Sequence, residues 1–169
     1  MNIFYLHNIP AIAASEHCDM HVGKMLIESC QMLATAHHML GNGHAVTYKP
    51  THVNHPSNVW VRESKVQYGW TVTLARYLAR EFERRYNKTH ASSKVLYAQL
   101  TQPPSALMSQ PTSWRTPPLC MPVEFHSSDA ILSYQKFYAS KSSKMPLKYY
   151  KGQQPQPRWL VDNLAATQS

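Results

Sequence analysis

The chain has 169 residues, 43% of them hydrophobic, which is typical of one globular domain and excludes a disordered chain. No apolar run reaches the roughly 18 residues that a membrane-spanning helix needs, and residues 1–14 lack the basic flank of a signal peptide. Lysine and arginine number 17 against 9 acidic residues. The resulting formal net charge of +8 favours a polyanionic partner, of which nucleic acid is the commonest.

The hydrophobic pattern predicts an all-α fold: one compact domain of about four to five helices over residues 1–160, then a frayed tail over 161–169. Residues 2–6 are apolar and form either a strand or an extended lead-in. Asp19 and Ser57 are suitable N-caps for the two longest helices, and the Gly-Asn-Gly run at 41–43 ends the first of them. We expect helices at residues 10–16, 19–40, 57–87, 92–100 and 128–138.

Residues 101–123 form an irregular, proline-stiffened crossing, either a packed loop or an excursion over a binding surface. Its prolines are Pro103, Pro104, Pro111, Pro117, Pro118 and Pro122. In the preceding long helix, Glu63 and Gln67 fall within the aromatic sector that faces the core. Polar residues at such positions are commonly functional or hydrogen-bonded structural sites, so we expect both to be polar groups in the core.

The helix predicted over residues 19–40 carries a polar stripe of side chains suited to catalysis. Alternating steps of three and four residues place on it His21, Lys24, Glu28, Gln31, Thr35 and His38. A carboxylate beside an amine and imidazoles can stabilise an oxocarbenium-like sugar, activate water or transfer protons. The alternative is a solvated helix face on which Lys24 simply pairs with Glu28.

We expect neither a metal nor a cofactor. The candidate ligands are His17, Cys18, Asp19, His21, His52 and His55, but no Cys-x-x-Cys or His-Glu-x-x-His spacing occurs. The His-Val-Asn-His run at 52–55 suggests an HNH nuclease, yet Pro56 leads directly into a helix and leaves no room for the hairpin of that fold. No glycine-rich phosphate loop is present, which argues against nucleotide hydrolysis and hydride transfer.

Three widely spaced cysteines indicate free thiols in a reducing cytoplasm.

The C-terminal segment interleaves cations with aromatic rings, a combination that binds phosphate while stacking bases. It contains Lys144, Lys148, Tyr149, Tyr150, Lys151, Arg158 and Trp159. The alternative is that the rings pack back on the helices while the lysines point outward.

Several motifs together resemble one known family. They are Met-Asn-Ile-Phe from residue 1, His-Cys-Asp-x-His-Val-x-Lys-Met-x-x-Glu-Ser-x-Gln-Met-Leu from 17, Tyr-Lys-Pro-Thr-His-x-Asn-His-Pro from 48, Trp-x-Arg-Glu-Ser from 60, Arg-Tyr-Asn-Lys-Thr-His from 85 and Pro-Arg-Trp from 157. On these residues the chain resembles the pyrimidine-dimer DNA glycosylases of tailed phages (the glycosylase/AP lyases of the endonuclease V type) and the small phage proteins related to them.

The resemblance implies a mostly helical, metal-free, monomeric protein of the phage-infected bacterial cytoplasm that grips double-stranded DNA and flips a nucleotide out of the stack. It also implies that the terminal amine attacks the sugar C1′ to form an imine, assisted by a helix-borne glutamate, before elimination cleaves the strand. We therefore expect Met1, Asn2 and Glu28 to be catalytic, together with His21 and Lys24 of the polar stripe, which stand where the family has arginines. Contacts with DNA are expected from His52, Asn54, His55, Arg62, Lys144, Lys148, Tyr149, Lys151 and Arg158.

Three functions remain open from the sequence. The first is a glycosylase-type enzyme that acts on a flipped nucleotide. The second is a phage enzyme that modifies a DNA base on the same scaffold. The third is a non-catalytic DNA-binding or host-takeover protein, in which the polar stripe only pairs charges.

Overall fold

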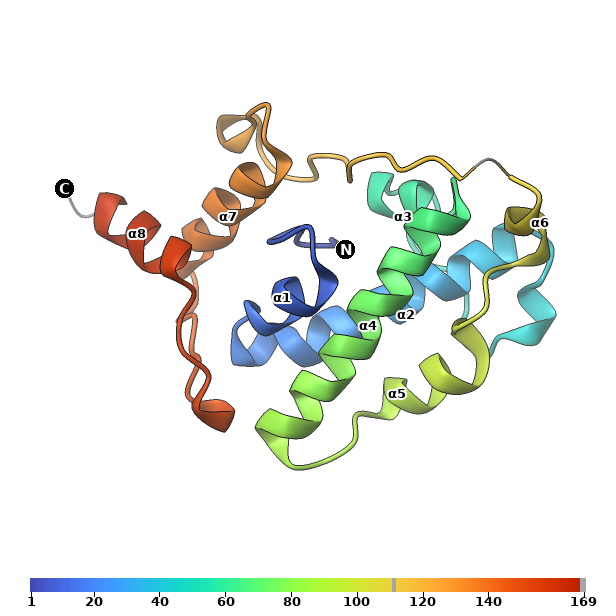
Figure 1. Cartoon of the computed structure of the whole chain (residues 1–169), viewed down its shortest axis with the longest axis horizontal. Coiled ribbons are helices and arrows are strands. Elements are labelled where there is room, and N and C mark those ends of the chain that lie inside the picture. Colours follow the sequence, from blue (N-terminus) through green and yellow to red (C-terminus); the bar gives the residue numbers. More distant parts are fainter. Residues whose placement is uncertain (111, 168–169) are drawn as a thin grey trace.

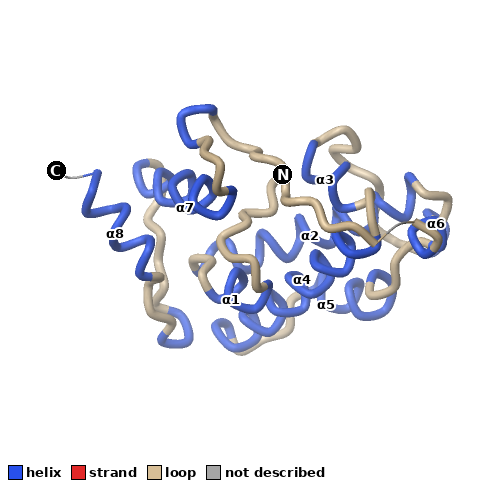
Figure 2. The backbone as a smooth tube through the Cα atoms, turned by 45° about the horizontal axis from the view of Figure 1, so that its top comes forward, coloured by secondary structure: helices blue, strands red, loops and turns tan. Residues whose placement is uncertain are grey.

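The computed structural model describes residues 1–110 and 112–167, and its α-helices within that part of the chain number eight (Figure 1). They are α1 (Pro10–Ser15), α2 (Asp19–Met39), α3 (Pro56–Val61), α4 (Lys65–Tyr86), α5 (Ala91–Val95), α6 (Ser105–Met108), α7 (Ala130–Ser140) and α8 (Arg158–Thr167). Short helical turns lie between them, and no strand is present in the described residues (Figure 2). The all-α prediction is therefore confirmed, whereas the expected four to five helices were too few.

The long helix expected over residues 57–87 is divided into α3 and α4. Ser64 adopts an extended conformation between them, and its hydroxyl caps α4 by accepting from the Gln67 N–H at 3.2 Å. His55, not Ser57, is the N-cap of α3, because its Nδ1 accepts from the Ser57 N–H at 3.2 Å.

The C-terminal end also differs from the expected tail. Residues up to Thr167 belong to α8, and the buried Leu160 anchors this helix in the core. Gln168 and Ser169, the last residues of the frayed tail that we expected, lie outside the described residues, as does Pro111 of the proline-rich crossing.

The centre of the molecule is the packing of α2 against α4 (Figure 1). Gly23 permits close approach, because a Cβ at this position would lie 3.1 Å from the ring of Phe82 on α4. The apolar side chains of Met25, Leu26 and Leu33 on α2 are fully buried. Each such side chain contributes about 1.5–3 kcal/mol of hydrophobic stabilisation.

The amino-terminal segment is neither of the expected alternatives, a strand or an extended lead-in, but an irregular stretch that turns at Phe4, which has a φ of 48° and whose carbonyl accepts from the Leu6 N–H at 2.8 Å. Residues 3–6 are buried in the core and lie between α7 and the α2–α4 pair (Figure 1). The Asn2 side chain shapes this entry, since its Oδ1 accepts from the Ile3 and Phe4 N–H groups at 2.7 and 2.9 Å. The segment is also tied to α7, where the Gln135 amide donates to the Leu6 carbonyl at 3.0 Å.

The proline-rich crossing is a packed strap. Residues 112–122 pass along one edge of the molecule from the side of α6 toward α7 (Figures 1 and 2). Gln67, only 2% exposed, accepts from the Arg115 N–H at 3.0 Å, and the Trp60 indole donates to the Arg115 carbonyl at 2.6 Å. Glu63, which we expected in the core, is exposed and forms an ion pair with the guanidinium of Arg115 in the strap.

No helix of the described residues is long and apolar enough to cross a membrane.

Candidate active site

A cavity of about 280 Å³ lies beside the amino end of the chain. It is assembled from segments that are far apart in the sequence: the amino-terminal segment, one face of α2, the strap and the end of α7. The lining residues are Met1, Asn2, Phe4, Lys24, Glu28, Cys120, Phe137 and Lys141. Four of the five expected catalytic residues therefore share one cavity: Met1, Asn2, Lys24 and Glu28.

Glu28 is oriented toward the start of the main chain. The Asn2 N–H donates to Glu28 Oε2 at 2.8 Å, and the terminal amine of Met1 lies 4.0 Å from the same oxygen. The Met1 side chain is 1% exposed and its sulfur contacts the Asn58 amide at 3.3 Å, so the first residue is fixed. The Asn2 amide donates to the Cys120 carbonyl at 2.9 Å and thereby joins the strap to the cavity.

The cavity has an excess of basic groups. Three amines, from Met1, Lys24 and Lys141, share it with the single carboxylate of Glu28. Such a balance favours an anionic ligand. Neither Lys141 nor Cys120 was predicted as a site residue, because both come from segments with no local motif and reach the site only through the tertiary fold.

His21, the fifth expected catalytic residue, is not in the cavity. It is 3% exposed, its Nδ1 shares a hydrogen bond of 2.7 Å with the Tyr138 hydroxyl, and its ring stacks on Phe4 with centroids 5.4 Å apart. Burial, aided by nearby cations, lowers the pKa of His21 to about 3, so the ring is neutral at pH 7. His21 is therefore part of the aromatic core, and the prediction that it acts at the sugar was wrong.

His55 is a histidine whose pKa is lowered by its burial and by the terminal amine. Burial is the main cause of its lowered pKa; the terminal amine and His52 lower it further, and Glu28 opposes them. The loop that carries these histidines is held by Asn58, whose amide donates to the carbonyls of Thr51 and His52 at 2.8 and 3.1 Å. His52 and Asn54 are exposed on this loop.

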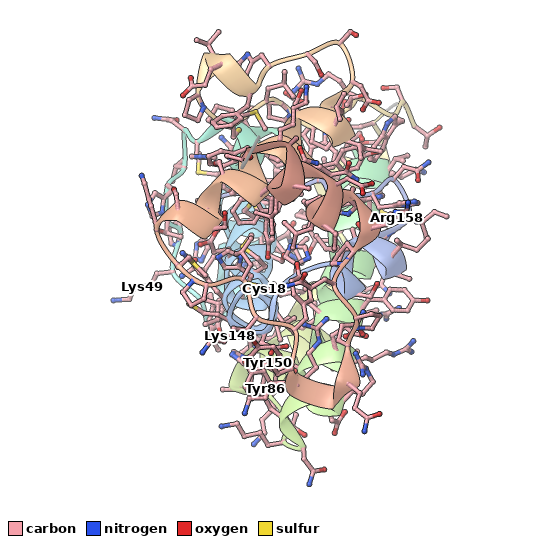
Figure 3. All side chains as sticks on the ribbon, turned by 90° about the vertical axis from the view of Figure 1, so that its left-hand side faces the viewer. Cys18, Lys49, Tyr86, Lys148, Tyr150 and Arg158 are labelled. Carbon is pink, nitrogen blue, oxygen red and sulfur yellow. The ribbon has the colours of Figure 1, made fainter. Side chains whose placement is uncertain are left out.

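The other expected DNA contacts are dispersed. Lys144 is exposed and near enough to the cavity to lower the pKa of Lys141. Arg62 is half-buried and does not line the cavity; its Nη1 is buried with no hydrogen-bond partner among the described residues. Arg158 is exposed, lies 3.6 Å from Asp162 and projects away from the other labelled cations (Figure 3).

A second cavity, of about 570 Å³, lies at the start of α2. Lys148, Lys151, Tyr150 and Tyr86 line it, and Figure 3 shows Lys148, Tyr150 and Tyr86 close together. Tyr149 is instead buried, with its hydroxyl donating to the Glu16 carbonyl at 2.7 Å. Its ring is unavailable for stacking on a base, so Tyr149 was wrongly expected at the DNA interface, and Tyr150 is the exposed ring of this pair.

No group of three His, Cys, Asp or Glu side chains that could hold a metal ion occurs in residues 1–110 and 112–167. Comparison with known protein families, curated proteins and solved structures finds no match to this chain.

Proposed function

We propose that this protein is a DNA-binding enzyme that acts on a flipped nucleotide, with the chemistry of a glycosylase and AP lyase. The observation that carries the proposal is the position of the Glu28 carboxylate, 2.8 Å from the Asn2 main-chain nitrogen and 4.0 Å from the Met1 amine. A carboxylate beside an amine is the pair that imine formation needs: one group attacks a carbon and the other accepts its proton.

The proposed reaction uses the terminal amine as nucleophile on C1′. In an abasic site the ring-opened sugar offers an aldehyde at this carbon. The amine adds to it, Glu28 accepts the proton, and water leaves to give the imine. Loss of a C2′ proton then expels the 3′ phosphate and cleaves the strand.

Processing of Met1 would not dismantle this arrangement. If Met1 is removed, the Asn2 nitrogen becomes the terminal amine, and it already lies 2.8 Å from Glu28 Oε2. Either form places an amine beside the carboxylate.

The surroundings of the cavity support a phosphate-bearing substrate. Lys24, Lys141 and Lys144 are grouped closely enough that both of the other lysines lower the pKa of Lys141. The exposed His52 and Asn54 lie on the loop next to His55, on which the terminal amine also acts. With a net charge of +8, the protein has the electrostatic character of one that binds a nucleic acid backbone.

The test is strand cleavage of ultraviolet-irradiated and abasic duplexes, with and without borohydride. Glu28→Gln keeps an oxygen to accept from Asn2, so the fold should survive while nicking falls by about 10²–10⁴. The control is Glu124→Gln, which changes an exposed carboxylate and should leave nicking unchanged.

Inactivity of the wild type on every such substrate, or full activity of Glu28→Gln, would overturn the proposal. Altered nucleosides found by mass spectrometry in uncut DNA would favour base modification instead. Salt-dependent binding without any product, unaffected by the loss of Glu28, would favour a non-catalytic role.

A further inference from the structure

The Lys141 amine has an environment unlike that of a surface lysine. Its Nζ lies 4.4 Å from the ring centroid of Phe137 and 5.1 Å from that of Phe4, against the apolar wall of the amino-terminal cavity. The Met1 amine is ion-paired with Glu28, whereas Lys141 Nζ has neither an ion pair nor a hydrogen bond among the described residues. The Lys141 amine therefore lines the cavity without a carboxylate or a hydrogen-bond acceptor from the described parts of the chain bound to it.

This environment lowers the pKa of Lys141 below that of an ordinary lysine, so the amine gives up its proton more readily than a surface lysine does. Burial first, and then the charges of Lys24 and Lys144, lower the pKa of Lys141, while Glu28 and the aromatic faces act in the opposite direction. A lysine in partly apolar surroundings beside another cation is a favourable nucleophile for carbonyl carbons. Lys24, by comparison, is exposed on α2.

We propose that Lys141 is a second carbonyl-reactive amine of this site, which forms an imine with the aldehyde of a ring-opened sugar held in the cavity. The identity of the sugar rests on the proposed function, but the reactivity of the amine does not. The neutral Nζ adds to the aldehyde carbon, and Glu28 takes the proton from nitrogen. Glu28 returns this proton to the former aldehyde oxygen, which becomes a hydroxyl. A second proton then moves from nitrogen to that hydroxyl in the same way, and the hydroxyl leaves as water, so no oxidant or reductant is required.

The first experiment needs no DNA. Reductive methylation with formaldehyde and cyanoborohydride at pH 7, followed by digestion and mass spectrometry, gives the labelling rate of each lysine. Lys141 should be methylated severalfold faster than Lys24 and Lys144, the two lysines whose charges act on it. The advantage should shrink toward pH 10, where the other amines also lose their protons. A rate for Lys141 equal to or below that of Lys24 would overturn the inference.

The second experiment uses an abasic duplex and borohydride. Digestion of the trapped complex should give a sugar adduct on Lys141, and Lys141→Arg should abolish that adduct while preserving the positive charge and duplex binding. Lys136→Arg, at an exposed lysine of α7 that does not line this cavity, is the matched control and should keep the adduct. An adduct confined to the terminal amine would refute the role of Lys141 and leave the proposed function intact. Absence of every adduct and of nicking, with fast methylation of Lys141, would instead refute the proposed function alone.

Discussion

Acidification should destabilise the fold, because two histidines are buried in their neutral form around Tyr138. His17 is fully buried; its Nδ1 donates to the Ala13 carbonyl at 2.6 Å, and its Nε2 has no partner in the described part of the chain. Burial is the main cause that lowers the pKa of His17 to about 4 and that of His21 to about 3. Nearby basic side chains reinforce these shifts: Arg85 acts on His17, and His17, Lys141 and Lys24 act on His21.

The size of the effect follows from proton linkage. In the unfolded chain both rings titrate near pH 6.5, so the unfolded state binds more protons below that pH and stability falls with acidification. Each ring then removes about 1.4 kcal/mol per pH unit until its folded-state pKa is reached. At pH 5 the two together remove about 4 kcal/mol, a large part of the 5–15 kcal/mol that a domain commonly has. Above pH 6.5 their stabilising contribution is complete.

Urea unfolding followed by circular dichroism at half-unit steps from pH 7.5 to 4.5 measures this dependence. His17→Gln combined with His21→Gln should flatten it, whereas His44→Gln, at an exposed position, should not. Burial also lowers the pKa of His37, His55 and His90, so a residual slope is expected in the double variant. A wild-type free energy of unfolding equal at pH 7 and pH 5 would refute the reasoning.

Two further predictions concern the fold and DNA binding. Arg85→Ala should lower the free energy of unfolding by about 3–5 kcal/mol, because it leaves the carboxylates of Asp19 and Glu81 without their buried cation. Urea denaturation measures this, and a loss below about 1 kcal/mol would mean that the pairs stabilise little. Lys144→Ala should reduce by about one the slope of log K against log salt for duplex binding. An unchanged slope in fluorescence-anisotropy titrations would place Lys144 outside the phosphate contacts.

Local patterns predicted the extent of α2, because the periodicity and the end signals of a helix are encoded within a few neighbouring residues, although its N-cap is Cys18 and not Asp19. The division of α3 from α4 also had a local signal, since Ser64 is a good N-cap, but the aromatic periodicity continued through it. The burial of Tyr149 could also have been predicted from the sequence. In an extended segment side chains alternate between faces, and here Leu147 and Tyr149 point inward while Lys148 and Tyr150 point outward.

The candidate site could be predicted only where a single helix carries it. Lys24 and Glu28 lie one turn apart on α2, so their proximity follows from helical geometry. His21 lies about one turn before Lys24 on the same stripe. However, Phe4 and Tyr138 cover it, and both of these residues are distant from it in the sequence. Lys141 is brought to the cavity by the packing of α7 against the amino-terminal segment, and no short-range pattern reports such a long-range contact.

The way in which the first residues are enclosed has a consequence for biosynthesis. Residues 3–6 leave the ribosome early, but their cover on α7 includes Gln135 and Tyr138, which are translated some 130 residues later. At about 5–20 residues per second, this apolar stretch of the nascent polypeptide stays without its native neighbours for on the order of ten seconds. Ribosomes stalled before α7 should therefore present it to chaperones or proteases.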